Sequence, residues 1–61
     1  MRTIDFFVEW TERFYNTLEK IANLFPCFVS TECVEMNWRE VQISARQEDM
    51  ARIENLLAEF I

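Results

Sequence analysis

Not one of the 61 residues is glycine, and this absence restricts both the turns and the binding loops that the chain can form. Glycine adopts positive φ at little steric cost, so a tight turn must place another residue type in that conformation. Phosphate-cradling loops and dinucleotide-binding turns also need glycine. Histidine is absent as well, which excludes a Ser-His-Asp triad, a Cys-His pair and an imidazole metal ligand. We therefore expect a binding protein without a cofactor, and not an enzyme.

Chain length and apolar content predict one small domain that meets another chain. A domain of this length removes only about 60% of its unfolded surface from water. Hydrophobic residues nevertheless make up 51% of the chain, which is more than so small a monomer readily hides. We expect a single domain over residues 1–61, with part of its apolar surface in contact with a partner.

The charge balance is acidic, with 6 basic and 11 acidic residues and a net charge of −5. Direct binding to nucleic acid or to anionic lipid needs clustered Lys and Arg, so we expect neither. No apolar run reaches the roughly 20 residues that cross a bilayer. Asp5 interrupts the N-terminal segment where a secretory signal would be apolar. The expected location is the cytoplasm.

Apolar residues at steps of three or four predict an amphipathic helix from Thr3 to Phe25. The stripe consists of Phe7, Trp10, Phe14, Leu18, Ile21 and Phe25. Thr3 is the expected N-cap, and Pro26 ends the helix because proline disfavours helical geometry in the preceding residue. Further apolar residues flank the stripe on both sides. We therefore expect the helix to be contacted from two directions.

Two strands are predicted, over residues 27–34 and 39–45, from β-branched residues and period-two alternation. Without glycine, Asn37 is expected to adopt positive φ at the end of a three-residue loop that starts at Glu35. In the resulting register one face carries Cys27, Val29 and Thr31 opposite Ala45, Ile43 and Val41. A two-residue loop is the alternative. It slips the pairing by one residue and mixes polar with apolar side chains on both faces.

A second amphipathic helix is predicted from Gln47 to Ile61, with Met50, Ile53, Leu57 and Phe60 at helical spacing. Ser44 and Gln47 have the spacing of a capping box. The expected fold is α+β, in the order helix, strand, strand, helix (αββα), with an antiparallel hairpin packed on both helices. Because an isolated hairpin is marginal in water, we expect a homodimer with a four-stranded sheet.

Neither the cysteines nor the carboxylates predict a reactive site. Cys27 and Cys33 are expected on one strand with their Cα atoms roughly 20 Å apart, too far for a disulfide. Two cysteines without histidine are too few for zinc, so we expect buried thiols and no metal. Glu32, Glu35 and Glu40 cluster at the hairpin, as the paired carboxylates of a glycoside hydrolase do. Such a small chain has little interior for a catalytic cleft, so a solvated surface is expected.

The candidate partner-binding residues are of two kinds. Apolar residues on the sheet face or loop that need not cover the helices are Phe28, Val34, Met36 and Trp38. If the helices lie on both faces of the sheet, these residues belong to the core instead. Acidic residues predicted along one face of the first helix are Asp5, Glu9, Glu12 and Glu19, a row that resembles the phosphates of DNA. Glu9 and Glu12 are the candidates from this row.

These features predict a small acidic inhibitor or regulator that binds stoichiometrically to a host protein, a nucleic-acid-processing enzyme being one such target. Phages and toxin–antitoxin loci encode proteins of this kind, and size alone suggests a viral origin. The alternative is a small-molecule or nucleotide-binding module with a pocket at a dimer interface. That pocket would be lined by Trp10, Tyr15 and Trp38, with Arg39 or Arg46 nearby. A DNA-binding regulator comes third, because no basic recognition helix is present.

Overall fold

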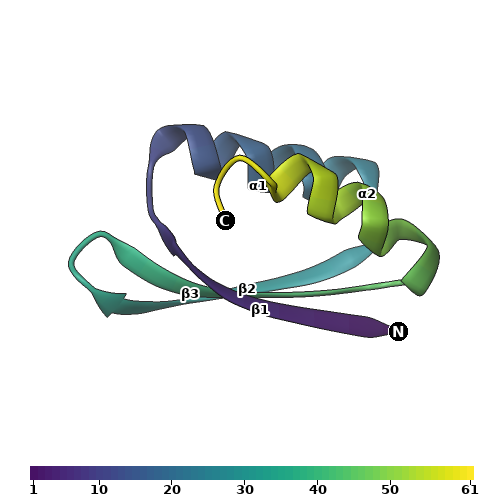
Figure 1. The fold of residues 1–61 in the computed structure, drawn as a ribbon, viewed down its shortest axis with the longest axis horizontal. Helices are drawn as coiled ribbons and strands as arrows, with labels where there is room; N and C mark the ends of the chain where they lie inside the picture. The colour runs from purple at the N-terminus through teal and green to yellow at the C-terminus, as the bar shows by residue number, and fades with distance from the viewer.

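Three strands and two helices build the fold, and the helices share one side of the sheet (Figure 1). The computed structural model describes residues 1–61. Its elements are β1 (Arg2–Glu9), α1 (Glu12–Leu24), β2 (Cys27–Glu35), β3 (Trp38–Ala45) and α2 (Gln47–Leu57). The strands form an antiparallel sheet in the order β1-β3-β2. The fold is α+β as predicted, but the element order is βαββα and not αββα.

The segment from Arg2 to Glu9 is a strand, where the sequence predicts the start of a helix. The alternate residues Ile4, Phe6 and Val8 point toward the core and are the less exposed ones of β1. All eight residues pair with β3. This ladder pairs the backbone groups of β1 that face β3, and Val8 is buried to 3% exposure, so the strand prevails over the local helical spacing.

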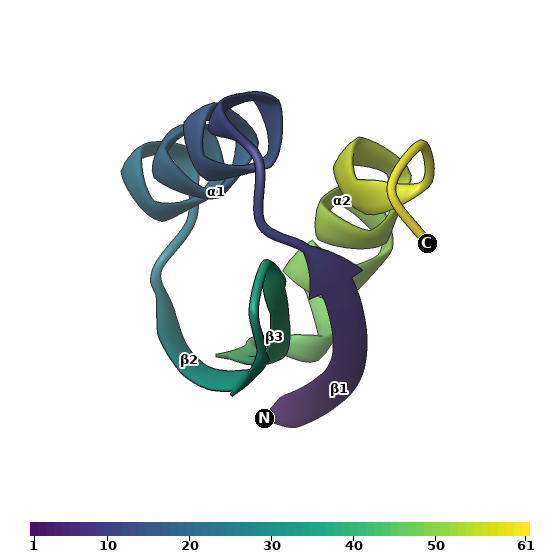
Figure 2. The same cartoon turned by 90° about the vertical axis from the view of Figure 1, so that its left-hand side faces the viewer.

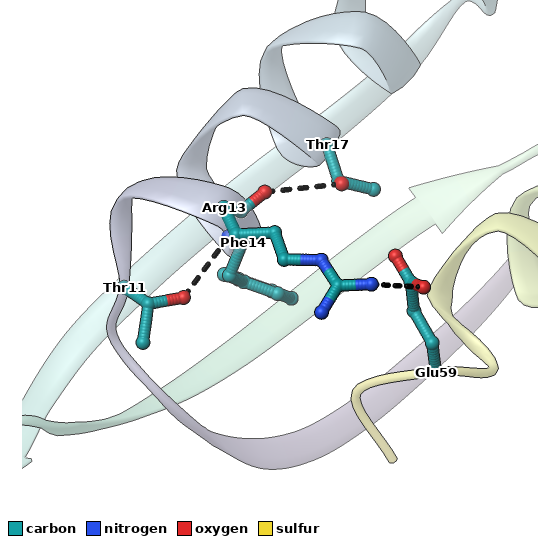
Figure 3. A network of polar contacts seen from close by, with 5 residues as sticks. All are labelled: Thr11, Arg13, Phe14, Thr17 and Glu59. Carbon is teal, nitrogen blue, oxygen red and sulfur yellow. Dashed lines mark hydrogen bonds and ion pairs between the residues drawn. The ribbon is translucent and has the colours of Figure 1, made fainter.

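Helix α1 therefore begins later than predicted, directly after its N-cap residue Thr11. The backbone of Thr11 is extended, and its hydroxyl accepts a hydrogen bond from the Phe14 amide at 3.1 Å (Figure 3). This is the N-cap geometry that satisfies a free donor of the first turn. The helix ends at Leu24, shortly before Pro26, as predicted. Its buried residues, Phe14, Leu18 and Ile21, belong to the predicted apolar stripe.

The pairing of β2 with β3 has the predicted register, in which Cys27, Val29 and Thr31 lie opposite Ala45, Ile43 and Val41. The turn differs from the prediction. Glu35 pairs with Trp38, so only Met36 and Asn37 connect the strands. The positive φ, 24°, belongs to Met36 and not to Asn37. The turn is one residue shorter than predicted, but a bulge between Cys33 and Glu35 leaves Val34 without a partner in β3. This extra residue restores the predicted pairing from Cys33 back to Cys27.

The core lies between the sheet and the two helices. Its buried hydrophobic residues are Val8, Phe14, Leu18, Ile21, Val41, Ile43, Ala45, Met50, Ile53 and Leu57. The fully buried Phe14 ring meets the rings of Phe6, Trp10 and Phe60 edge to face, at centroid distances of 6.2, 5.8 and 5.1 Å. These aromatic contacts therefore hold β1, α1 and the C-terminal segment together in the core.

Helix α2 begins at the predicted residue but ends at Leu57, followed by a turn. Its N-cap is Arg46, so the predicted capping by Ser44 is wrong. Its buried hydrophobic residues, Met50, Ile53 and Leu57, are among those that the spacing predicts. An ion pair of 2.6 Å between Arg13 and Glu59 links the start of α1 to the turn that follows α2 (Figure 3). Neither helix is both long and apolar enough to cross a membrane.

One chain by itself forms a three-stranded sheet, with β1 and β2 at its two edges (Figure 2). The four-stranded sheet of a dimer was expected because two strands alone are marginal. A third strand from the same chain removes that reason. The predicted two-stranded sheet therefore lacks one strand, because the sequence pattern assigned the residues of β1 to the first helix.

Candidate functional site

The sheet has one face without a helix (Figure 1). We call it the open face. It consists of the alternate strand residues Thr3, Asp5, Phe7, Phe28, Ser30, Glu32, Glu40, Gln42 and Ser44. The sequence allowed helices on both faces. Because both helices lie on the other side, these side chains are not needed for the core.

Three carboxylates occupy the middle of the open face. Glu32 lies directly opposite Glu40, and Asp5 lies opposite the neighbouring Gln42. They line a shallow hollow of about 300 Å³ together with Ser30, Thr31 and Gln42, without a hydrophobic side chain. The pKa of Glu40 is raised above its ordinary value, first by the negative charge of Asp5, then by loss of hydration and by the charge of Glu32. The open face therefore concentrates like charges.

No basic side chain belongs to the open face. The Lys and Arg residues are Arg2, Arg13, Lys20, Arg39, Arg46 and Arg52. Three of them form ion pairs with residues of α2 or of the turn after it. The pairs are Arg2 with Glu54, Arg13 with Glu59, and Arg46 with Asp49. The Arg39 guanidinium lies over the Trp10 ring, 4.5 Å from its centroid. The negative charge of the open face is therefore not neutralised within the sheet.

Two exposed phenylalanines lie on either side of these carboxylates. Phe7 is 59% exposed and lies opposite Glu40, and Phe28 is 72% exposed and lies opposite Ser44. Large exposed aromatic side chains are enriched at protein interfaces. Phe28 was a candidate from the sequence, whereas Phe7 was missed. The helical spacing placed Phe7 in a core stripe, and only the strand assignment turns it outward.

A second group of exposed residues lies at the turn between β2 and β3. A cleft of about 270 Å³ is lined by Glu9, Glu35, Met36, Asn37 and Trp38, and we call this group the hairpin end. Trp38 lies opposite Glu9 of β1 and Glu35 of β2 and is 49% exposed. Met36 is 90% exposed. The hairpin end adds two carboxylates and two large apolar side chains to the surface.

The structure thus brings together three of the predicted partner-binding residues, Glu9, Met36 and Trp38. Val34 lies beside them at the register irregularity of β2 and is exposed. Phe28 lies nearer the opposite end of the sheet. Glu12 begins α1 on the helix side of the sheet, away from the open face.

The acidic row predicted along the first helix does not exist. Asp5 and Glu9 belong to β1, and only Glu12 and Glu19 belong to α1. Because the strand and the helix lie in different layers, the four carboxylates do not share one helix face. The acidic surface is formed instead by cross-strand neighbours on the sheet.

The two cysteines are unpaired and differ in environment. Cys27 is half-buried and Cys33 is exposed, so the expectation of two buried thiols is wrong for Cys33. Burial, and then the charge of Asp49, raises the pKa of the Cys27 thiol. A raised pKa keeps this thiol protonated and unreactive.

An apolar groove lies on the other side of the sheet, between α1 and β2, and we call it the α1–β2 groove. Its volume is about 400 Å³, and it is lined by Trp10, Tyr15, Leu18, Glu19, Ala22, Val29 and Thr31. The Trp10 and Tyr15 rings meet at 6.0 Å. Of the residues predicted to line a small-molecule pocket at a dimer interface, Trp10 and Tyr15 line this groove. Trp38 lines other clefts, and Arg46 is paired with Asp49.

Comparison of the chain with known protein families, with curated proteins and with solved structures finds no match.

Proposed function

We propose that the chain is a small regulator or inhibitor that binds stoichiometrically to a basic protein surface through the open face and the hairpin end. The observation that carries this proposal is the distribution of charge. The two surfaces hold the carboxylates of Asp5, Glu9, Glu32, Glu35 and Glu40 without a Lys or Arg among them. Exposed aromatic residues beside these carboxylates offer apolar contact area. A partner with Lys and Arg around apolar residues would be complementary.

A nucleic-acid-processing protein is the partner class that this charge favours. Proteins that contact phosphates carry clustered Lys and Arg, and an acidic sheet face competes for the same residues. The same charge disfavours a homodimer through the open face, because two copies would oppose like charges. A homodimer would have to use another surface.

The experiment that tests this function compares three substitutions in capture from host extract at moderate salt. Glu32→Lys reverses a charge in the middle of the open face, and Trp38→Ala truncates the hairpin end. Glu12→Lys is the matched control, because it changes the net charge equally on the helix side. We expect wild type and Glu12→Lys to retain one stoichiometric basic protein, and the other two variants to lose it.

Calorimetry with the identified partner would then measure the affinity of each variant at two salt concentrations. We expect affinity to fall with salt, because exposed charges are screened over about 8–10 Å at physiological ionic strength. Circular dichroism checks that each variant is folded. Equal retention by wild type, Glu32→Lys and Trp38→Ala would refute the proposal.

A small-molecule binding module is the second candidate, and the α1–β2 groove supports it. The lining is mostly apolar, and Arg39 lies over Trp10 at its border. An apolar ligand that binds there should raise the melting temperature in proportion to the logarithm of its concentration. A compound screen by thermal shift, repeated with Ala22→Arg to fill the groove, tests this candidate.

A further inference from the structure

The helix side of β2 is covered less by the helices than that of its neighbour β3. Val29 lies opposite Ile43, yet Val29 is 37% exposed and Ile43 is fully buried. Thr31 is exposed in the same way opposite the fully buried Val41. Opposite residues share a face of the sheet, so the difference comes from where the helices lie. Figure 2 shows β2 at the outer edge of the sheet, below α1.

β2 is also an edge strand. In the order β1-β3-β2 it has one neighbour, so its outward N–H and C=O groups have no strand partner. The regular part of this edge runs from Cys27 to Cys33, where the register irregularity begins. β1 is the other edge, but its helix-side residues Ile4, Phe6 and Val8 pack against the core. An apolar groove therefore adjoins the edge of β2 and not that of β1.

The α1–β2 groove begins at this free edge. Five of its lining residues are hydrophobic, and Glu19 is its one charged group. From Tyr15 to Ala22 helix α1 rises by about 10 Å. Side chains on one face of a strand are about 7 Å apart. The groove therefore has the length to receive two consecutive same-face side chains of a strand laid beside β2.

We propose that an extended segment of the protein partner adds to the sheet as a fourth strand beside β2. Its backbone pairs with the free edge, and its alternate apolar side chains enter the α1–β2 groove. Its remaining side chains lie on the open face beside Ser30 and Glu32, where the local charge favours Lys or Arg. The occupant is therefore a segment that alternates apolar and basic residues. This inference rests on the proposed function and specifies how the basic partner is held.

The first test titrates synthetic peptides into ¹⁵N-labelled protein. Four seven-residue peptides alternate Lys with Val, Ile, Leu or Phe, and block peptides of the same compositions place all Lys at one end. We expect the alternating peptides to shift the amide signals of Val29, Thr31 and Ala22 and to slow hydrogen exchange along the edge of β2. The block peptides share the charge but cannot alternate their side chains, and we expect them to bind more weakly.

Backbone pairing is tested without changing the protein. Two versions of the best peptide carry N-methyl groups on either the odd or the even amides. In a strand only alternate amides face one neighbour. We therefore expect one version to lose binding and the other to retain it. Equal binding by both versions would overturn pairing with β2.

The groove is tested by Ala22→Arg, which places a long side chain in it from an exposed helix position. Asn23→Arg is the matched control, because the next residue of α1 receives the same charge but does not line the groove. We expect Ala22→Arg to weaken peptide binding by about tenfold or more, equivalent to about 1.4 kcal/mol, and Asn23→Arg to change it little. If Ala22→Arg does not fold, the N-methylated pair decides the question.

Three results of the peptide test would overturn strand addition. The first is no binding at about 1 mM peptide, which corresponds to a binding free energy of only about −4 kcal/mol. The others are equal affinity for block and alternating peptides, and amide shifts confined to the open face.

The two proposals fail separately. If Glu32→Lys loses the natural partner and Ala22→Arg keeps it, the open face is used and strand addition is wrong. If Ala22→Arg loses the partner and Glu32→Lys keeps it, the open-face proposal is wrong. Loss in both variants supports both proposals.

Discussion

Glu32 of β2 and Glu40 of β3 are direct cross-strand partners, so two carboxylates face each other on an exposed sheet surface. Like charges placed directly opposite each other destabilise a sheet. Asp5 adds a third charge, and it is the largest cause of the raised pKa of Glu40. This arrangement lowers the stability of the free chain, which is the cost expected of the cation-binding surface that we propose.

Glu40→Gln should raise the stability of the free chain at neutral pH. Because the folded pKa of Glu40 is raised, its contribution to stability is fully present below the ordinary value of 4.5 and is lost as the pH rises through the folded pKa. At pH 7 the wild type therefore carries repulsion that Glu40→Gln removes. Thermal unfolding should show a higher Tm for the variant at pH 7 and nearly equal Tm values near pH 4. A stability gain that is the same at both pH values would contradict this account.

Substitutions at the opposed residues Ile43 and Val29 should have very different effects on stability. Ile43→Ala opens a cavity in the core and should cost about 2–5 kcal/mol. Val29→Ala removes a partly exposed side chain and should cost less than about 1 kcal/mol. Urea unfolding measures both values, with an unchanged m-value as the check that the unfolding transition is comparable. Similar costs would mean that the helices cover β2 in solution.

Thr11→Ala should shorten or destabilise α1. The Thr11 hydroxyl accepts the Phe14 amide hydrogen bond, and loss of an N-cap costs about 1 kcal/mol. Thr11→Ser keeps the acceptor and should be nearly neutral. Thr3→Ala removes only an exposed hydroxyl contact with Ser44 and should change stability by about 0.5 kcal/mol or less. The opposite order of effects, measured by urea unfolding and helical circular dichroism, would place the helix start at Thr3.

Asp49→Ala should destabilise the start of α2. Asp49 is the one buried charged residue, and its carboxylate accepts a hydrogen bond of 3.0 Å from the Arg46 Nε. Loss of this bond, and of a negative charge in the first helical turn, should cost about 1–2 kcal/mol. Glu48→Ala is the control, because Glu48 is exposed and 3.8 Å from the same nitrogen. It should cost about 0.5 kcal/mol or less in urea unfolding.

Local patterns were sufficient for the hairpin and for most of both helices. The period-two alternation around Val29 and Ile43 predicts their pairing, because a slip by one residue exchanges the faces of a strand. The helical spacing of Phe14, Leu18 and Ile21 predicts the buried side of α1. The turn was predicted less well. Asn37 tolerates positive φ better than Met36, but the bulge in β2 determines which residue adopts it.

Residues 3–9 were assigned wrongly, to a helix, because they carry two periodicities at once. Ile4, Phe6 and Val8 alternate as in a strand, while Phe7 and Trp10 continue the helical spacing of α1. Local patterns do not separate these possibilities. The three candidate residues that meet at the hairpin end depend on the same choice, since Glu9 reaches Trp38 only as part of β1.

By itself, then, the sequence determined the hairpin register, the core sides of both helices, the acidic balance and the lack of residues for common catalytic sites. Tertiary structure decided that residues 2–9 join β3. The central strand thereby gains a second ladder of hydrogen bonds from a segment whose paired residues lie 29 to 43 positions away in the sequence. That pairing turns Phe7 and Asp5 outward beside Glu40 and makes the open face. It also leaves β2 at an edge with Val29 partly exposed, since an edge strand has a neighbour on one side only and its side chains are buried less than those of the central β3.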